Sequence, residues 1–417
     1  MERGKKKYVI MAATLSGMGG AQMYIRSKML FLRSHGWDVD IIAAQSQNVI
    51  IPELNEFKKN TFPELQYNKY YYGRWIQKQV MNQLKTIIIK DNKYEDIVIE
   101  STIITQSTWA ESLARIVGAR HLVYLLQEHN VVVNRYLCDF FIFKHSRHEL
   151  AGIKETTLIA MFQPFHPLKE DESYRLSAHC TNVEADIEHP LLHSIDKKKY
   201  DYVIGVLSRL DKPFVSYALN DIYNYIDKQR EKRFLLLWIG DAPEGSKIPD
   251  RVKNLFSQIP NVDVIITGYL YPVPTRLLGL CDVFISSAGS SHVCRRSGIP
   301  TICYDGNDYK PIGVLGRTTN NSLFRDSNEP PQSLDNLLYQ VLVDNKYEKI
   351  PPSYRIGLPD FQSHLDFLDL MSREKDYYNT DEIHLETRRE KRVALGLKIF
   401  GPNGYTWLHK IKNRMFN

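Results

Sequence analysis

The sequence is 417 residues long, with 43% hydrophobic and 24% charged residues, so it is long enough for two or three domains and is not typical of a disordered chain. No apolar run approaches the length that spans a bilayer. The apolar segment after MERGKKK soon reaches serine and glycine, which argues against a signal peptide. The five cysteines include no C-x-x-C pair, which argues against a zinc site and indicates a reduced, cytoplasmic setting.

The net charge of +6 is concentrated at the C-terminus, where residues 388–417 carry eight Lys or Arg and one Glu, a net charge of +7. Nucleic-acid binding is disfavoured, because it would more often show basic residues spread over a folded face with aromatics placed to stack. Apolar residues, among them Leu395, Ile399 and Trp407, lie between these cations. The segment therefore predicts either docking on an anionic membrane surface or a C-terminal helix packed on the protein itself.

The chain begins with a strand, a glycine loop and a helix. Lys7–Ala13 is uniformly apolar, as expected of a strand buried on both faces, and Ala21–His35 has helical spacing of apolar residues. Val39–Ala44 resumes strand character, which completes a βαβ unit. The glycines of TLSGMGG lie too close together for G-x-G-x-x-G, and no acid ends the second strand, so NAD binding is disfavoured.

The alternation of elements continues to about residue 160. The expected elements are a strand at Asp96–Glu100, a helix at Ile104–Val117, a strand at His121–Leu126, a further strand-like run at Phe140–Phe143, a helix beginning at Ser146 and a strand at Leu158–Met161. Before them, an irregular stretch concentrates the aromatic residues Tyr67, Tyr70, Tyr71, Tyr72 and Trp75. These side chains are interpreted either as packing and surface residues or as a stacking surface for a sugar acceptor.

Residues 164–200, with three prolines and a lysine run, predict the transition to a second domain. The expected elements of that domain are strands at Tyr202–Leu207, Phe234–Ile239, Val262–Thr267, Asp282–Ser286 and Thr301–Tyr304, with helices at Tyr217–Gln229 and Leu277–Leu280. The fold class is therefore predicted as α/β, with two Rossmann-like, doubly wound parallel-sheet domains facing a central cleft. The domains are expected at 1–195 and 200–345, followed by a C-terminal extension at 346–417.

The stretch Cys281–Thr301 combines a short buried strand, the small-residue turn Ser287–Ser291 and a short helix that ends at Gly298. A turn of Ser, Ala and Gly lets a ligand approach the backbone, and the free N–H groups of the following helix favour an anion. The alternative is an ordinary tight crossover in a parallel sheet.

The order of these motifs resembles the GT-B fold glycosyltransferases, particularly the retaining families 4 and 1 of bacterial polysaccharide and glycolipid assembly. Gly19-Gly20-Ala21-Gln22 is similar to the GGA loop of these enzymes. Val203–Pro300 contains, in the family's order, S-R-L with a nearby Lys, strands ending in G-D and in G, a D-V-F-I strand and a final G-I-P. The resemblance implies a nucleotide-diphosphate sugar as the donor substrate, no cofactor and no metal ion, and no D-x-D acid pair at a strand end suggests one.

The resemblance also implies roles for individual residues. Arg209 and Lys212 of SRLDK match the positions that hold the donor diphosphate, where two cations stabilise the charge on the leaving group. The other donor-binding residues that it implies are Gly19, Gly20, Asp241, Gly268, Gly289, Ser290 and Ser291. His129 matches a histidine near the transferred sugar, and His129 or Glu128 is the candidate catalytic base of an inverting reaction. Ser146 matches a post-strand serine of the family and is interpreted alternatively as a helix N-cap.

One departure from the family pattern falls in Cys281–Thr301. Where the retaining enzymes have two glutamates separated by seven residues, this chain has V-C-R-R-S-G-I-P, so Val293 stands in the place of the acid that binds the ribose. The small-residue turn is then expected to act through backbone amides and the hydroxyls of Ser290 and Ser291. Asp305 is the candidate for a carboxylate contact to the ribose. The departure leaves open whether the reaction retains or inverts configuration.

Three functions follow from these observations: a glycosyltransferase, a catalytically degenerate GT-B partner of an active transferase, and a sugar-nucleotide epimerase. The first is the preferred hypothesis because of the ordered series of strand-end motifs, and the missing acids motivate the second. The epimerase is less favoured, because the basic tail fits an acceptor held at a membrane better than a freely soluble substrate. We expect transfer of a sugar to a glycan or lipid-linked acceptor in cell-surface polysaccharide or capsule biosynthesis. The expected location is the cytoplasm, peripherally on the inner face of the membrane.

Overall fold

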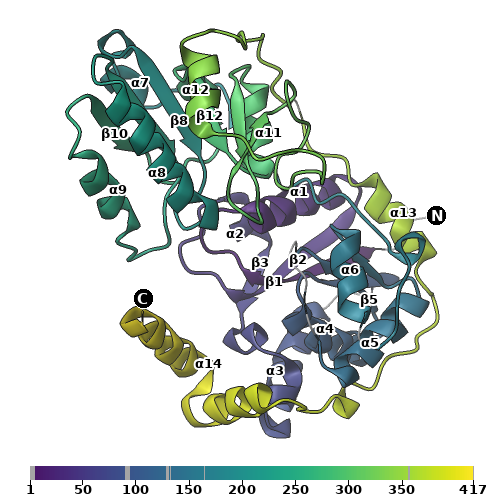
Figure 1. Ribbon diagram of the computed structural model, residues 1–417. Helices are drawn as coiled ribbons and strands as arrows, with labels where there is room; N and C mark the ends of the chain where they lie inside the picture. Colours follow the sequence, from purple (N-terminus) through teal and green to yellow (C-terminus); the bar gives the residue numbers. More distant parts are fainter. Residues whose placement is uncertain are drawn as a thin grey trace. The chain divides into compact units, whose positions relative to one another are not determined.

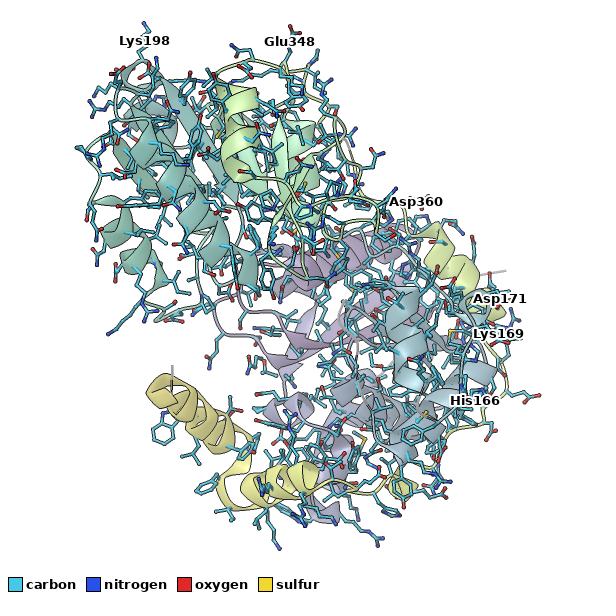
Figure 2. The ribbon with its side chains drawn as sticks, in the orientation of Figure 1. His166, Lys169, Asp171, Lys198, Glu348 and Asp360 are labelled. Atoms are coloured by element: carbon cyan, nitrogen blue, oxygen red, sulfur yellow. The ribbon has the colours of Figure 1, made fainter. Side chains whose placement is uncertain are left out.

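Two sheets organise the chain, one in each of two units (Figure 1). The structure, a computed structural model, describes residues 5–89, 94–127, 131, 133–163, 165–355 and 357–416. Unit 1 contains the residues up to 16, residues 24–179 and the chain from 358; unit 2 contains residues 17–23 and 180–357. Charged side chains project from the surface of each unit, among them Lys169 and Asp171 of unit 1 and Lys198 and Glu348 of unit 2 (Figure 2).

Unit 1 is built on an all-parallel sheet in the order β3-β2-β1-β4-β5-β6. Its strands are β1 (Lys6–Thr14), β2 (Trp37–Gln45), β3 (Lys58–Thr61), β4 (Asp96–Ser101), β5 (Arg120–Leu125) and β6 (Leu150–Gly152). Its helices are α1 (Gly20–Ser34), α2 (Glu53–Phe57), α3 (Arg74–Ile88), α4 (Ile104–Val117), α5 (Arg135–Ser146), α6 (Glu155–Phe162), α13 (Gln362–Leu370) and α14 (Arg388–Phe416). The central strand β1 is fully buried from Tyr8 to Ala12, which explains why its sequence shows no polar alternation.

Helices cover both faces of this sheet. On one face, a core that includes Val9 and Met11 packs against α3, α4 and the middle of α14. Tyr8 points to the opposite face, because successive side chains of a strand alternate. There Lys28 of α1 lies over the Tyr8 ring and its Nζ is 3.0 Å from Nδ1 of His364 in α13. The C-terminal segment therefore contributes helices to both layers of unit 1.

The helix α14 is interrupted at Gly401 (φ 63°, ψ 174°), which is followed by Pro402, and Figure 1 shows its two pieces meeting at an angle. A Cβ on Gly396 would lie 2.2 Å from the ring of Tyr405, so glycine at position 396 permits the second piece to pack against the first. Within the described ranges, every helix is too short or too polar to cross a membrane.

Unit 2 repeats the strand order of unit 1, as β10-β9-β8-β12-β13-β14, with only β14 antiparallel to its neighbour among the pairs described. Its main strands are β8 (Tyr202–Leu207), β9 (Phe234–Ile239), β10 (Val262–Ile266), β12 (Val283–Ser286), β13 (Thr301–Tyr304) and β14 (Pro311–Val314). Its helices are α7 (Leu191–Ser194), α8 (Pro213–Lys228), α9 (Ile248–Phe256), α10 (Thr275–Gly279), α11 (Gly289–Arg296) and α12 (Leu334–Leu342). Helices α8, α9 and α12 pack on one face, and α7, α10 and α11 pack on the other. The short strands β7 (Glu184–Ala185) and β11 (Val273–Pro274) pair separately.

The prediction of elements is confirmed over most of the chain, with α4, β9 and β13 at the predicted bounds. It is wrong in one part of unit 1. Phe140–Phe143 lies inside α5, Ser146 ends that helix instead of beginning one, and Leu158–Met161 lies inside α6. Short apolar runs of this kind fit a buried strand and the buried face of a helix equally well. The strand between these two helices, β6, has only three residues and was not predicted.

The boundaries between the units differ from the expected ones. Unit 2 begins at Cys180 instead of residue 200, and the expected extension from 346 is divided between the units after residue 357. Residues 346–357 belong to unit 2, where Lys349 Nζ lies 2.9 Å from Asp282 Oδ1. The chain from 358 belongs to unit 1, so unit 1 is assembled from segments at both ends of the sequence.

Candidate functional site

The carboxyl ends of the strands of unit 2 gather most of the residues expected to bind the donor. Strands β8, β9, β10 and β12 are parallel, so their carboxyl ends meet at one edge of the sheet. The loops that leave this edge carry Arg209, Asp241, Gly268 and Gly289. In doubly wound sheets this edge is the usual place for a bound ligand.

The loops after β8 and β9 are held together by close backbone contacts. Gly240 has φ 147°, and a Cβ there would lie 2.1 Å from the carbonyl oxygen of Ser208, so only glycine fits. The same carbonyl accepts a hydrogen bond from Trp238 Nε1 at 2.9 Å. Leu210 N donates to Asp241 O at 2.9 Å. These contacts fix the positions of Arg209 and Asp241 relative to one another.

The glycine loop that precedes α1 belongs to unit 2 and lies beside Arg209. A Cβ on Gly19 would be 3.7 Å from Arg209 Nη1, and a Cβ on Gly20 would be 3.1 Å from the Cβ of Cys180. The Arg209 side chain is 44% exposed, and its Nε lies 3.1 Å from Asp211 Oδ1. Asp211 thus orients an accessible guanidinium next to the glycine loop.

Lys212 is in the same turn as Arg209. It stands immediately before Pro213, the first residue of α8, and its backbone N–H donates to Arg209 O at 3.4 Å. The residue is partly buried. Both cations of the S-R-L-D-K stretch are therefore placed within one turn at the carboxyl end of β8.

Asp241 and Gly268 face each other across the loops that follow β9 and β10. Gly240 and Gly268 form an isolated β-bridge, and a Cβ on Gly268 would be 3.7 Å from Asp241 Oδ2. The other carboxylate oxygen of Asp241 accepts the N–H of Ala242 at 2.8 Å. Burial raises the pKa of Tyr269, and the charges of Arg209 and Asp241 also act on that pKa.

The turn before α11 has the conformation expected of a binding loop. Ala288 has φ 58° and ψ −138°, a combination that residues other than glycine rarely adopt and that is common at ligand sites. Among the described residues, no side chain caps the start of α11, so the first N–H groups of this helix retain their positive partial charge. Gly289 packs on Cys180, because a Cβ there would be 3.4 Å from the Cys180 carbonyl oxygen. Ser290 is partly exposed beside it.

Three residues of this region are engaged elsewhere. Ser291 is fully buried, so its hydroxyl does not reach the loop surface. Val293 is also fully buried and packs in the apolar core of unit 2. Asp305 accepts hydrogen bonds from the N–H groups of Asn307 at 2.6 Å and Arg325 at 2.7 Å, which accounts for both carboxylate oxygens. Its role is to hold its own loop.

The expected catalytic residues, Glu128 and His129, lie outside the described residues. The neighbouring Gln127 is described and lies beyond the carboxyl end of β5. Ser146 ends α5 and donates its hydroxyl to Phe143 O at 2.9 Å, so it is not the N-cap of a helix. In the described part of the chain, no three His, Cys, Asp or Glu side chains gather as metal ligands would.

The aromatic stretch of unit 1 contributes to the core and to the lining of a groove. Tyr72 is buried in the core. Tyr67 and Tyr71 line a groove with the first part of α14, and Tyr70 lines a smaller cavity beside it. Trp75 is the most exposed of the group. The arginines of α14 that complete the groove were not among the predicted site residues, although the basic tail pointed to this segment.

No protein-family model and no curated protein matches the sequence. Solved structures match over most of the chain. A glycosyltransferase from Rickettsia africae aligns with a TM-score of 0.57 and 16% identity, over 83% of this chain and 91% of that one. HepE of Anabaena in complex with UDP and glucose aligns with a TM-score of 0.51 and 12% identity, over 82% and 91%. TarM aligns with a TM-score of 0.51 and 11% identity, over 87% and 98%. The chain therefore has the two-domain GT-B fold, and the predicted fold class is confirmed.

Proposed function

We propose that the protein is a glycosyltransferase that moves a sugar from a nucleotide-diphosphate sugar to a glycan or lipid-linked acceptor. The observation that carries this proposal is the grouping of Gly19, Arg209 and the uncapped start of α11 within unit 2. Cations, glycine backbone and helix N–H groups are the elements that bind a diphosphate. HepE, which has the same fold, was solved with UDP-glucose, and this supports a nucleotide sugar as the donor.

In the proposed reaction, the oxygen of an acceptor hydroxyl forms a bond to the anomeric carbon of the donor sugar. The bond between that carbon and the diphosphate oxygen breaks, and its electron pair leaves with the nucleotide. The hydroxyl proton passes to a base, for which His129 or Glu128 is the candidate in an inverting enzyme. Arg209, Lys212 and the N–H groups of α11 stabilise the charge on the departing diphosphate, so the chemistry needs no divalent ion.

The decisive test removes both cations of the S-R-L-D-K stretch. We expect Arg209→Ala/Lys212→Ala to abolish transfer from UDP-sugars and GDP-sugars and to remove the thermal stabilisation that a bound donor gives. The matched control is Arg251→Ala/Lys253→Ala, which removes the same charge from an exposed face of α9. The assignment would be refuted if the Arg209→Ala/Lys212→Ala variant kept full turnover and unfolded at the same temperature as the wild type.

A second candidate function, a non-catalytic partner of an active transferase, is favoured by one observation. Val293 fills the apolar core at the position where the related enzymes carry the acid that binds the ribose. Isothermal titration calorimetry with UDP-glucose and GDP-mannose separates the two functions. A transferase binds at least one nucleotide sugar, and the partner protein binds neither.

We also propose that the transferase works peripherally on the inner face of the membrane, in cell-surface polysaccharide biosynthesis. The support comes from α14, where Leu395, Ile399, Phe400 and Trp407 are exposed between basic residues. Ile399→Ser should reduce sedimentation with vesicles of phosphatidylcholine and phosphatidylglycerol. The control is Leu370→Ser on α13, because Leu370 is 63% exposed and Ile399 is 62% exposed. Equal sedimentation of the two variants would contradict this location.

A further inference from the structure

A groove of about 1270 Å³ runs along the first part of α14 in unit 1. Its wall on the helix carries Arg388, Arg389 and Arg392, and the facing wall is largely aromatic, with Tyr67, Tyr71 and Phe165. A smaller cavity of about 220 Å³ adjoins it and shares Tyr71, Val133, Asn134 and Glu390 as lining residues. The two spaces together offer an aromatic surface beside a set of cations.

The acids of the groove are already engaged in holding the chain. Glu390 Oε2 accepts the N–H groups of Glu386 and Thr387 at 2.9 and 2.8 Å, and its Oε1 accepts Asn134 Nδ2 at 2.7 Å. Glu386 Oε2 accepts the N–H of Arg135, the first residue of α5, at 3.1 Å. These carboxylates therefore accept hydrogen bonds at the N-termini of α14 and α5 and stabilise the two helix ends.

The three arginines have no such engagement. Among the described residues, no carboxylate lies within ion-pair distance of Arg388, Arg389 or Arg392, although Lys and Arg side chains pair with carboxylates at many other positions. A guanidinium presents a planar fork of N–H donors that matches phosphate and carboxylate groups. The groove is therefore suited to an anionic ligand.

The smaller cavity carries hydrogen-bond acceptors that lack a donor. Three of its lining residues are Asn68 in the aromatic stretch, Thr105 beyond the carboxyl end of β4, and Gln127 beyond the carboxyl end of β5. Asn68 Oδ1, Thr105 Oγ1 and Gln127 Oε1 are buried and have no hydrogen-bond partner among the described residues. Buried polar atoms are normally paired, so three unpaired oxygens in one cavity indicate a ligand that donates hydrogen bonds. The hydroxyl groups of a sugar supply such donors.

The arginines continue directly into an apolar stripe along the helix. Arg388, Arg392, Leu395 and Ile399 follow the spacing i, i+4, i+7 and i+11, which places them on one face of α14. Leu395 and Ile399 are exposed. An anionic group bound by the arginines would thus lie at the head of a surface suited to a hydrocarbon chain.

We infer that the groove binds the acceptor, and that the acceptor is a saccharide joined through a phosphate to a lipid. The phosphate lies on Arg388 and Arg392, the chain leaves along Leu395 and Ile399, and the sugar occupies the cavity of Asn68, Thr105 and Gln127. This inference rests on the proposed transferase function, since it assigns the substrate class of the acceptor. Binding of a nucleotide sugar to the donor site in unit 2 is measured independently, and it separates a failure of this inference from a failure of the proposed function.

The binding test uses the full chain and three soluble probes in isothermal titration calorimetry. Geranyl monophosphate carries phosphate and chain, geraniol carries the chain alone, and glucose 1-phosphate carries phosphate and sugar without a chain. We expect geranyl monophosphate to bind at least ten-fold more tightly than the other two. Equal affinity for geraniol would overturn the phosphate site, and equal affinity for glucose 1-phosphate would overturn the lipid-linked acceptor in favour of a free sugar phosphate.

Paired substitutions on α14 locate the phosphate. We expect Arg388→Gln/Arg392→Gln to weaken geranyl monophosphate binding at least ten-fold. Lys391→Gln/Lys398→Gln removes the same charge from the same helix outside the groove lining and should change affinity less than two-fold. An equal loss in both pairs would indicate non-specific attraction and overturn the site. Both double variants should bind UDP-glucose as tightly as the wild type does. If the wild type itself did not bind UDP-glucose, that result would count against the proposed function and not against the acceptor site.

A hydroxyl deletion tests the sugar cavity. Thr105→Val removes one unpaired oxygen and keeps the side-chain shape, and Thr157→Val does the same on α6, away from the cavity, where Thr157 Oγ1 is also buried and unpaired. With the diester of glucose 1-phosphate and geraniol as the probe, Thr105→Val should weaken binding three- to ten-fold and Thr157→Val should not. Geranyl monophosphate, which has no sugar, should bind both variants equally. An equal effect of Thr105→Val on both probes would overturn the assignment of this cavity to the sugar.

Discussion

The two units have the same strand order and very different interiors. Both sheets follow the order 3-2-1-4-5-6 of their own strands. Among the described residues, the buried Asp, Glu and Lys side chains of unit 1 are Lys7, Lys28, Asp40, Lys69, Glu100, Glu111, Lys144 and Glu149, whereas unit 2 buries one such residue, Asp305. In the part of the chain that the structure describes, unit 1 therefore buries several charged side chains within its apolar core, whereas the buried polar residues of unit 2 are almost all uncharged.

The difference follows from the segment that packs against the sheet of each unit. Unit 2 is closed by its own helix α12, whose leucines join the apolar core. Unit 1 is closed by the returning segment 358–387, in which α13 is the one α-helix described. Polar groups of unit 1 bind the backbone of that segment: the partly buried Arg120 donates from Nη1 to Leu368 O in α13 at 2.6 Å, and the buried Glu111 Oε1 accepts the N–H of Tyr378 at 2.8 Å. The charges of unit 1 thus position the segment that leads to α14.

The largest expected effect comes from breaking one of the two most deeply buried lysine–glutamate pairs of the described chain, Lys28 with Glu100. Glu100 also accepts the hydroxyl of Tyr24 at 2.6 Å, and both charged side chains are almost inaccessible to solvent. Lys28→Met leaves an unpaired carboxylate in the core and should lower the free energy of unfolding by about 3–5 kcal/mol. Urea denaturation measures this loss.

Two controls sharpen the comparison between the units. Lys28→Met/Glu100→Gln removes both charges and should recover at least half of the lost stability. In unit 2, Lys228→Met breaks an exposed ion pair with Asp335 and should cost at most about 1 kcal/mol. A loss below 1 kcal/mol for Lys28→Met would show that the buried charges do not hold unit 1 together.

The second effect is a loss of stability in mild acid. Burial lowers the pKa of His121 to about 4, with a further contribution from Lys144, and burial together with Lys28 lowers the pKa of His364 to about 2. Their ordinary pKa is 6.5, so between pH 7 and pH 5 the unfolded chain gains a proton at each histidine and the folded chain does not. Stability must therefore fall as the pH falls, by about 2 kcal/mol for each histidine.

Denaturation at pH 7 and pH 5 measures this dependence. His364→Gln should remove about half of it, because one of the two histidines no longer takes up a proton on unfolding. The control is His193→Gln in unit 2, whose side chain is exposed and which should keep the full dependence. Equal stability of the wild type at pH 5 and pH 7 would contradict the neutral state of both buried histidines.

The third effect tests the close backbone contacts that take the place of charges in unit 2. Gly240→Ala forces a Cβ against the carbonyl of Ser208 in a backbone conformation that favours glycine, and should cost about 1–3 kcal/mol. Because the loops after β8 and β9 are then displaced, UDP-glucose binding should weaken several-fold. Gly36→Ala is the control, since Gly36 also has positive φ (81°) but no atom lies within 4 Å of its Cβ position. Gly36→Ala should lower stability without weakening the binding of UDP-glucose.

How much of this could be predicted from the sequence differs between fold and site. Periodicity gave α4 and β9 correctly, because a long helix and an uninterrupted apolar strand have distinct patterns. The run Phe140–Phe143 was assigned wrongly because four apolar residues fit either element. Its helical state depends on Asn134, which caps α5 by accepting the N–H of Leu137 at 2.8 Å. That capping residue was visible in the sequence and would have corrected the assignment.

The candidate site was predictable where it consists of strand-end loops. Arg209 and Gly268 follow from the order of strands, since parallel strands bring their carboxyl ends to one edge. Ser291 did not follow, because the direction of a hydroxyl at a helix start depends on which face packs on the core. The groove on α14 could not be predicted either. It depends on contacts such as Tyr67 Oη with Thr406 Oγ1 at 2.8 Å, between residues 339 positions apart.

The smallest expected effect comes from Lys69, which joins the same returning segment near the surface. Its Nζ lies 2.9 Å from Thr380 Oγ1 and 2.6 Å from Asp381 Oδ1, but the Asp381 side chain is 68% exposed. Lys69→Met therefore leaves a carboxylate that water can solvate, in contrast to Glu100, and should cost about 1 kcal/mol or less. Limited trypsin digestion should nevertheless cleave after Arg388, and so release the chain from 389 onward, faster than in the wild type. If Lys69→Met lowered the free energy of unfolding as much as Lys28→Met does, the contribution of a charge to the stability of unit 1 would not depend on how deeply its partner is buried.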